Sequence, residues 1–167
     1  MVTDCSRIIL LIVALVFLPN RSLAQAGEQP TVEQLKQLHA QLVHDIQNGK
    51  PLSMTAPADL RKPLANYVRG QQAPTYAQLL AIVEQQFAAN DLPEVTVVVV
   101  SSPHQCMVKY KPVVGGTLLD LGETRQEKKL KPKFYRFTCA CSDNGSQLTQ
   151  QVDCTENATV SFECGHE

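Results

Sequence analysis

Apolar residues recur at helical spacing in the first half of the chain. One apolar stripe runs from 31 to 47 and consists of Val32, Leu35, Leu38, Leu42, Val43 and Ile46. Apolar residues that recur every three or four positions predict an amphipathic helix. Thr31, followed three residues later by Gln34, has the pattern of a capping box at its start. Gly49 is placed to end the helix.

Two further stretches have the same periodicity. The segment 75–89 repeats the capping-box pattern with Thr75 and Gln78, and its apolar positions are Tyr76, Leu79, Leu80, Ile82, Val83 and Phe87. The segment 57–69 has an apolar side made of Leu60, Leu64, Tyr67 and Val68. Pro63 lies inside this second segment, so the helix there is expected to be kinked or shorter than its pattern.

At Pro93 the pattern changes from helical to extended. Val95–Val100 is β-branched throughout and predicts a buried strand. Further short strands are predicted at 105–111, 125–130, 133–141, 147–154 and 158–164. The turns are expected at Gly115-Gly116 with Gly122 (a longer loop), Lys131-Pro132-Lys133, Asn144-Gly145 and, closing a last hairpin, Thr155–Asn157. The fold class is therefore α+β, with a short N-terminal helical segment followed by a small antiparallel β-sandwich.

Residue parity indicates which face of each strand is buried. In the last strand Val160, Phe162 and Cys164 share one face, and Ser161 lies on the other. Side chains alternate between the two faces of a sheet, so the apolar parity marks the core. The cysteines that follow residue 93 all fall on that apolar parity, and they are Cys106, Cys139, Cys141, Cys154 and Cys164.

The N-terminus has the features of a secretory signal peptide. Arg7 precedes an apolar run from Ile8 to Leu18, and small residues follow at Ala24 and Ala26. An uncleaved anchor would need about 20 apolar residues, and this run is shorter. We expect cleavage after residue 26, an extracytoplasmic location in the periplasm or outside the cell, and no stable membrane insertion afterwards. The expected organisation is 1–26 signal peptide, 27–92 helical segment and 93–167 β-sandwich domain.

Charge argues against a nucleic-acid partner. The formal net charge is −1, and the one basic cluster is Lys128, Lys129, Lys131 and Lys133. Nucleic-acid affinity depends on many neutralised phosphates, whereas lysines on a sheet edge also discourage edge-to-edge aggregation.

His39 and His44 lie five residues apart, which does not place them on one helical face. No catalytic residue, cofactor or metal ligand set is predicted.

The β part resembles the PEGA domain family, small β-sandwiches related to the regulatory-like domains of carboxypeptidases. The resemblance covers about 70 residues, 95–164, and rests on the run Val95–Val100 into Ser101-Ser102-Pro103, the strand Cys106–Tyr110, the element Gly122-Glu123-Thr124, and Leu130-Lys131-Pro132-Lys133-Phe134-Tyr135. Gln105-Cys106 stands where the family has its eponymous Gly-Ala. The resemblance implies a non-catalytic module of the cell envelope.

The odd number of cysteines in the mature chain leaves at least one outside any internal bridge. Cys139 and Cys141 lie two apart on one predicted strand, at a Cα separation of about 6.5–7 Å that is at the edge of disulfide geometry. We expect them to bond to different partners, through bridges between non-adjacent strands or between sheets, and the pairing stays open. The single residue between them does not match the spacing of a zinc knuckle.

Three functions are compatible with these patterns. The first is a non-enzymatic structural or ligand-binding module of the envelope, with an envelope protein or a glycan as partner. The second is an accessory or inhibitor-like protein that binds another protein through its N-terminal helices. The third is a thiol redox protein that uses Cys139 and Cys141.

Overall fold

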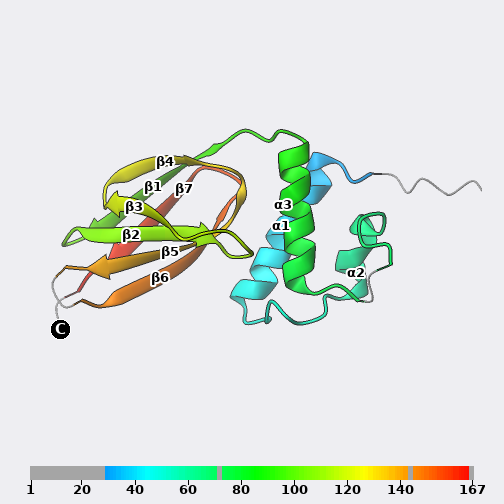
Figure 1. The fold of residues 1–167 in the computed structure, drawn as a ribbon, viewed down its shortest axis with the longest axis horizontal. Helices are drawn as coiled ribbons and strands as arrows, with labels where there is room; N and C mark the ends of the chain where they lie inside the picture. The colour runs from blue at the N-terminus through cyan, green and yellow to red at the C-terminus, as the bar shows by residue number, and fades with distance from the viewer. Residues whose placement is uncertain (1–28, 71–72, 143–144, 166–167) are drawn as a thin grey trace, which may run out of the picture.

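A computed structural model describes residues 29–70, 73–142 and 145–165 of the chain. In this part of the chain, helices precede seven strands, which form two sheets. Figure 1 shows the helices at one end of the two sheets. The protein is thus α+β, with the helices first and a mainly β part after them. The predicted signal peptide, 1–26, lies outside the described residues.

The two long helices begin as their capping boxes predict. Helix α1 covers Val32–Gln47 and α3 covers Tyr76–Ala89. Thr31 Oγ1 accepts a hydrogen bond from the Gln34 amide at 3.2 Å, and Gln34 Oε1 accepts one from the Thr31 amide at 2.8 Å. These bonds satisfy backbone groups that have no partner within the first turn.

The middle helical segment is shorter than its apolar pattern. Only Ala58–Arg61 forms an α-helix, α2, and the chain then tightens into a 3₁₀ turn, η1, at Lys62–Leu64. Pro63 lies in η1. It cannot donate a backbone hydrogen bond, and its ring restricts the residue before it, so the α-helix ends there.

The seven strands form a three-stranded and a four-stranded sheet. The three-stranded sheet has the order β4-β1-β7 and contains β4 (Gln126–Leu130), β1 (Val95–Ser102) and β7 (Ala158–Glu163). The four-stranded sheet has the order β3-β2-β5-β6 and contains β3 (Leu119–Glu123), β2 (Cys106–Pro112), β5 (Lys133–Cys141) and β6 (Gln147–Cys154).

Strand β3 lies where the sequence predicts a long loop. It pairs with β2 in antiparallel register, and that register shifts between Val108 and Lys109. Gly122, expected to mark the loop, lies inside β3 with a φ of +105°. Only glycine adopts this conformation without strain. The strand has no clear alternation of apolar residues because most of it is exposed or half-buried.

Two of the predicted turns, one of them expected to close a hairpin, instead connect one sheet to the other. Strand β7 does not pair with β6 but runs parallel to β1, with Val97 opposite Ala158. Strand β4 pairs with β1, whereas β5 pairs with β2 and β6, so the turn at Lys131-Pro132 also joins the two sheets. The sandwich therefore contains one parallel pair. Placing β7 beside β1 buries Val160 and Phe162 between the sheets.

The described residues have two apolar cores. One lies between the sheets, and the other lies among the helices. Phe134, on β5, is fully buried in the helical core, and its backbone amide donates to Glu84 Oε1 of α3 at 2.9 Å. The helical core thus includes a side chain of the four-stranded sheet, which joins the two parts of the molecule.

The five cysteines of the β part are buried, as parity predicts. Cys106 bonds to Cys139, and Cys141 bonds to Cys164, each pair with a Cα separation of 5.8 Å. The second bridge joins the two sheets, as expected. The first joins the neighbouring strands β2 and β5, so the expectation of non-adjacent strands or separate sheets is wrong for that pair. The reason is a diagonal contact, because Cys106 lies opposite Cys141 and reaches the cysteine two residues away.

Among the described cysteines, Cys154 is the free one. Burial, with a smaller effect from the neighbouring Asp153 carboxylate, raises the pKa of its thiol to about 12. The thiolate, which is the reactive form, is therefore disfavoured. None of the helices in the described part of the chain has the length and apolarity needed to cross a membrane.

Candidate functional site

The outward side of the four-stranded sheet carries mostly polar side chains. On β5 the buried residues Tyr135, Phe137 and Cys139 alternate with Arg136 and Thr138, which point away from the sandwich core. Across β2, β5 and β6 the register aligns three rows, Lys111–Arg136–Gln151, Lys109–Thr138–Thr149 and Met107–Ala140–Gln147. We call these nine residues the open sheet face.

The open sheet face begins where the helical core ends. The next row along β5 and β6 pairs Phe134 with Asp153, and there the helices cover the sheet. The nine residues line a hollow of about 650 Å³, with Leu118 at its side. Ligand sites in proteins typically have volumes of this order. The helices thus bound the hollow at one end, and beyond them the sheet is not covered by the helical core.

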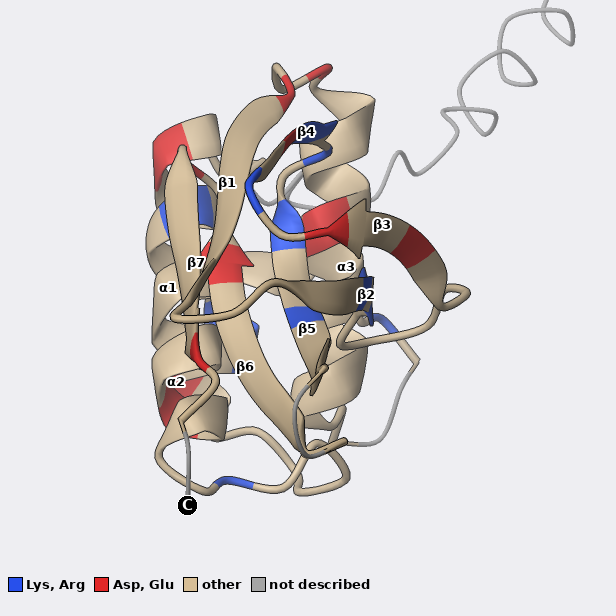
Figure 2. Cartoon of the chain, turned by 90° about the vertical axis from the view of Figure 1, so that its left-hand side faces the viewer, with Lys and Arg blue, Asp and Glu red and all other residues tan. Residues whose placement is uncertain are grey.

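Three cationic side chains line this hollow, and none of the described residues that line it is a carboxylate. They are Lys109, Lys111 and Arg136. Figure 2 shows basic positions on β2 and β5. Lys109 Nζ lies 3.6 Å from Asp120 Oδ1 of β3, but both side chains are more than half exposed, so this ion pair is weak. The hollow therefore carries a net positive charge.

The polar side chains of the open sheet face offer hydrogen-bond donors and acceptors. The hydroxyls of Thr138 and Thr149 lie 3.4 Å apart across β5 and β6. Gln47, at the end of α1, donates from Nε2 to the backbone oxygen of Gln151 at 3.1 Å. This bond fixes the end of α1 at the border of the hollow, so the surface is held by regular strands and by the helical layer.

Beneath that border, a histidine and two carboxylates meet between the helices and the sheet. His39 of α1 is completely buried, with Nε2 3.6 Å from Glu84 Oε1 and Nδ1 3.4 Å from Asp153 Oδ1 of β6. Lys133 Nζ lies 3.9 Å from the other Glu84 oxygen. His39 also packs against the ring of Phe87, at a centroid distance of 5.3 Å. The cluster links α1, α3, β5 and β6.

The carboxylates determine the charge of this cluster. Burial lowers the pKa of His39, but the neighbouring Asp153 and Glu84 raise it by more, and the net pKa is above the ordinary 6.5. For Asp153, burial raises the pKa, while His39 and then Thr155 lower it by more, so its net pKa is depressed. Both shifts favour the ion pair. With His39 inaccessible to solvent, the cluster is suited to holding the helices on the sheet.

The burial of His39 beside two carboxylates was not predicted from the sequence. A signal was present, because His39 lies four residues after Leu35 and three before Leu42, and so on the buried stripe of α1. A titratable residue at such a position needs a partner in the core. The partner Asp153 is supplied by a strand more than a hundred residues away, which the periodicity of α1 does not reveal. His44, expected on another face, is exposed.

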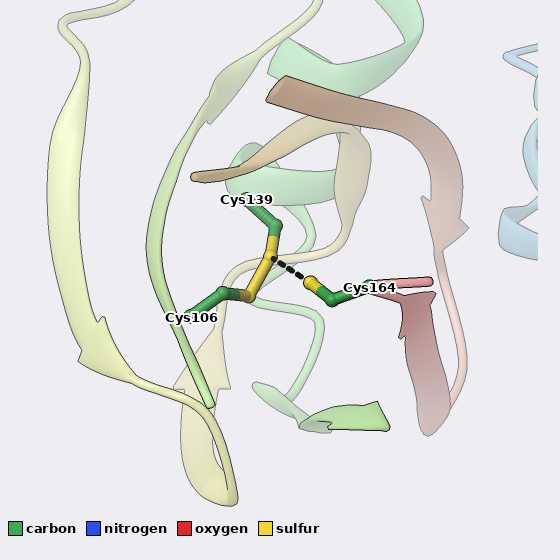
Figure 3. Close-up of side chains that lie close together, drawn as sticks. All are labelled: Cys106, Cys139 and Cys164. Carbon is green, nitrogen blue, oxygen red and sulfur yellow. Dashed lines mark hydrogen bonds between the residues drawn. A yellow bond between two sulfur atoms is a disulfide. The ribbon is translucent and has the colours of Figure 1, made fainter. Parts of the chain in front are cut away.

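The cysteines form a compact sulfur cluster away from the open sheet face. The sulfurs of Cys106, Cys139 and Cys164 all lie within 4.8 Å of one another, and Cys139 Sγ is 3.9 Å from Cys164 Sγ (Figure 3). Cys139 and Cys141 bond to different partners, as expected. Sulfurs held in disulfides are not thiolates and do not ligate a metal as such.

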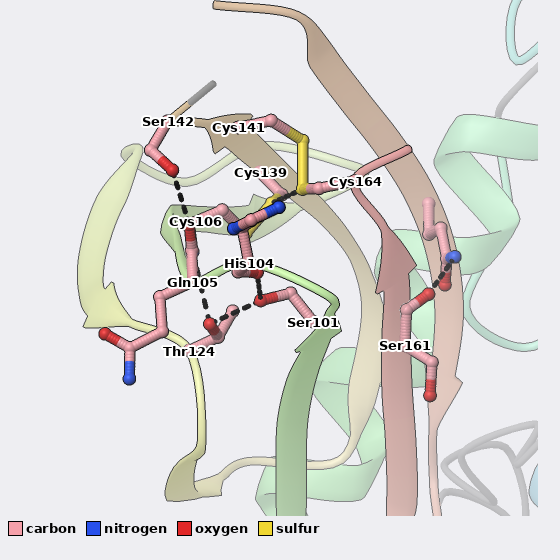
Figure 4. Close-up of a disulfide and its surroundings, with 11 residues drawn as sticks. Ser101, His104, Gln105, Cys106, Thr124, Cys139, Cys141, Ser142, Ser161 and Cys164 are labelled. Carbon is pink, nitrogen blue, oxygen red and sulfur yellow. Dashed lines mark hydrogen bonds between the residues drawn. A yellow bond between two sulfur atoms is a disulfide. The ribbon is translucent and has the colours of Figure 1, made fainter. Parts of the chain in front are cut away.

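Hydrogen bonds surround the inter-sheet bridge. Near the Cys141–Cys164 disulfide, the Ser101 and Thr124 hydroxyls lie 2.6 Å apart, and the Cys106 amide donates to Thr124 Oγ1 at 3.2 Å (Figure 4). Thr124 is a buried polar residue whose hydroxyl is thereby satisfied. This end of the sandwich is fixed by covalent bonds and polar contacts together.

Sequence reasoning selected the five cysteines as its only candidate residues and missed the open sheet face. The sequence did contain a signal for this face. In the predicted strand 105–111, Met107, Lys109 and Lys111 alternate with the buried positions and so share the outward side. Comparisons of the chain with protein-family models, with curated proteins and with solved structures give no match.

Proposed function

We propose that the protein is a non-enzymatic binding module of the cell envelope that holds its ligand on the open sheet face. The observation that carries this proposal is the hollow of about 650 Å³ on regular strands, lined mainly by polar side chains that point away from the core. A preorganised surface binds with a small entropic cost because its side chains stand on a fixed backbone.

An extracytoplasmic location is part of the proposal. Two disulfides are supporting evidence, because such bonds form and persist in oxidising compartments. The signal peptide expected over 1–26 gives a route to such a compartment. The PEGA resemblance of 95–164 is also part of the proposal, and the two sheets are compatible with the β-sandwich that it implies.

A non-enzymatic role fits the placement of the titratable residues. The histidine that meets two carboxylates, His39, is buried at the junction of helices and sheet rather than in the hollow. General acid or base catalysis requires a group within hydrogen-bond reach of a substrate. Cys139 and Cys141, on which a thiol redox role would depend, are each bonded to another cysteine.

A matched pair of threonine substitutions tests the binding surface. Thr149→Trp places a large side chain in the hollow, whereas Thr159→Trp places the same side chain at an exposed position of β7 in the other sheet. The exported chain is applied to an array of envelope polysaccharides, and retained ligands are titrated by calorimetry. We expect Thr149→Trp to abolish binding and Thr159→Trp to leave it unchanged. Equal binding by both variants, or no ligand retained by the unmodified chain, would contradict the proposal.

A second candidate function is the binding of another protein by the helices. It is favoured by a separate hollow of about 610 Å³ between α1 and the α2–η1 segment, where Leu38, Leu60 and Pro63 lie among glutamines. Gln37→Trp fills this hollow without touching the sheet. If this candidate is right, Gln37→Trp removes a partner captured from envelope extracts and Thr149→Trp does not.

A further inference from the structure

Two cations face each other directly on the open sheet face. Lys111 of β2 lies opposite Arg136 of β5 in the antiparallel register, and Lys109 is one row further along the same face. Directly opposed side chains on a sheet have Cβ atoms about 4.5–5.5 Å apart, and like charges in that position destabilise the pairing. Lys111 and Arg136 are therefore a repulsive pair in the row of the hollow that lies next to the helical core.

Within the part of the chain that the structure describes, this pair has no counter-charge. Neither Lys111 nor Arg136 forms an ion pair with any described carboxylate, and the ion pair of the face is the exposed contact between Lys109 and Asp120. The Nε atom of Arg136 is shielded from solvent and has no hydrogen-bond partner among the described residues. A guanidinium that is not committed to an internal acceptor is suited to a planar anion such as a carboxylate.

The remaining lining identifies the kind of molecule that carries the anion. Gln147, Gln151, Thr138 and Thr149 supply amides and hydroxyls that pair with sugar hydroxyls. None of the ten lining residues is aromatic, whereas binding of single-stranded nucleic acid depends on aromatic stacking. Peptides that extend a sheet bind at its edge, and this hollow lies over the central strands β2 and β5 together with β6.

We propose that the open sheet face binds an acidic polysaccharide, with Lys111 and Arg136 engaging its carboxylates and the threonines and glutamines engaging its hydroxyls. This inference rests on the proposed function and specifies its ligand class. Bound carboxylates relieve the repulsion between the two cations. The negative charge of the ligand is thus matched to the one part of the face that lacks a counter-charge.

The experiment measures binding of the exported chain to polygalacturonate, to its fully methyl-esterified form and to polyglutamate. Lys111→Gln/Arg136→Gln removes two charges from the hollow. The control, Lys128→Gln/Lys129→Gln, removes two exposed charges from β4 of the other sheet. A hydrogen bond to a charged group is worth enough that the first variant should lose about tenfold or more in affinity for polygalacturonate. The control should change it less than about twofold, as expected for distant charges screened by salt.

The other arms separate this inference from the proposed function. Esterification should remove most of the binding, and raising NaCl from about 50 to about 300 mM should weaken it. Equal loss in both double variants would mean general electrostatic attraction and would overturn the inference. Tighter binding of polyglutamate would overturn it in favour of an acidic peptide. If the esterified polymer binds equally well and Thr149→Trp still blocks it, the face binds a neutral glycan, and only the ligand class is wrong.

Folding of the charge variant is checked separately. Because Lys111→Gln/Arg136→Gln removes a repulsion and leaves the core intact, its melting temperature should equal or exceed that of the unmodified chain. A loss of affinity with retained melting temperature then belongs to the binding surface. A charge variant that melts normally and still binds polygalacturonate with full affinity would refute the assignment of these two cations.

Discussion

Replacing Phe134 by alanine tests whether one side chain of the sheet holds the helices in place. Phe134 is fully buried in the helical core, although it belongs to β5. Its amide also joins the two parts by donating to Glu84 of α3, while its carbonyl accepts from Val113, next to β2, at 2.8 Å. Alanine retains both backbone bonds, so the substitution isolates the contribution of the ring.

The expected cost follows from complete burial. Removing a buried phenylalanine ring leaves a cavity and costs about 3–5 kcal/mol. For a chain of this size one kcal/mol lowers the melting temperature by about 3 °C, so Phe134→Ala should lower it by about 9–15 °C. The loss is large against total stabilities of about 5–15 kcal/mol.

Hydrogen exchange of backbone amides locates the effect. Phe134→Ala should speed exchange most in α1 and α3, because their core loses the ring. Phe162→Ala is the matched control, since Phe162 is 1 % exposed but lies in the core between the sheets, and it should act most on β1 and β7. If Phe134→Ala instead loosens β1 and β7 while α1 and α3 keep their protection, the ring does not hold the helices and the reasoning is refuted.

Phe162→Ala should cost about 3–5 kcal/mol, whereas Ser161→Ala on the outward face of β7 should change stability by less than about 0.5 kcal/mol; equal melting temperatures would mean that β7 is not half-buried. Because the pKa of His39 is raised, its ion pairs add to the folding stability fully below pH 6.5. This contribution is lost as the pH rises through the higher folded-state pKa. The lowered pKa of Asp153 implies stability present above 3.8 and lost as pH falls through its folded-state pKa. In urea unfolding, the free energy of unfolding of His39→Gln should therefore change less between about pH 6 and 8 than that of the unmodified chain. If both depend on pH with the same slope, the ion pair is contradicted. Reducing both disulfides should lower stability by about 2–4 kcal/mol for each bridge, and a reduced chain that melts unchanged would show that they are dispensable.

The local elements follow from the sequence because their causes are local. Two capping boxes and an apolar stripe define α1 and α3, and the alternation of apolar and polar residues gives the buried faces of β2, β5 and β7. Burial of all five cysteines in the β part follows from the same alternation. Each of these features depends on residues within a few positions of one another, where the periods of helix and strand apply directly.

Only the tertiary structure decided which strands are neighbours and what the outward faces form. A short turn before β7 predicts a hairpin with β6, yet β7 lies beside β1, about 60 residues earlier, because that position buries Val160 and Phe162. Lys111 and Arg136 are 25 residues apart, and only the pairing of β2 with β5 makes them opposite neighbours. His39 meets Asp153 in the same way, through helix-on-sheet packing. The periodicity of a segment determines which of its sides is buried, but the energy of packing distant segments determines what that side, or the opposite one, meets.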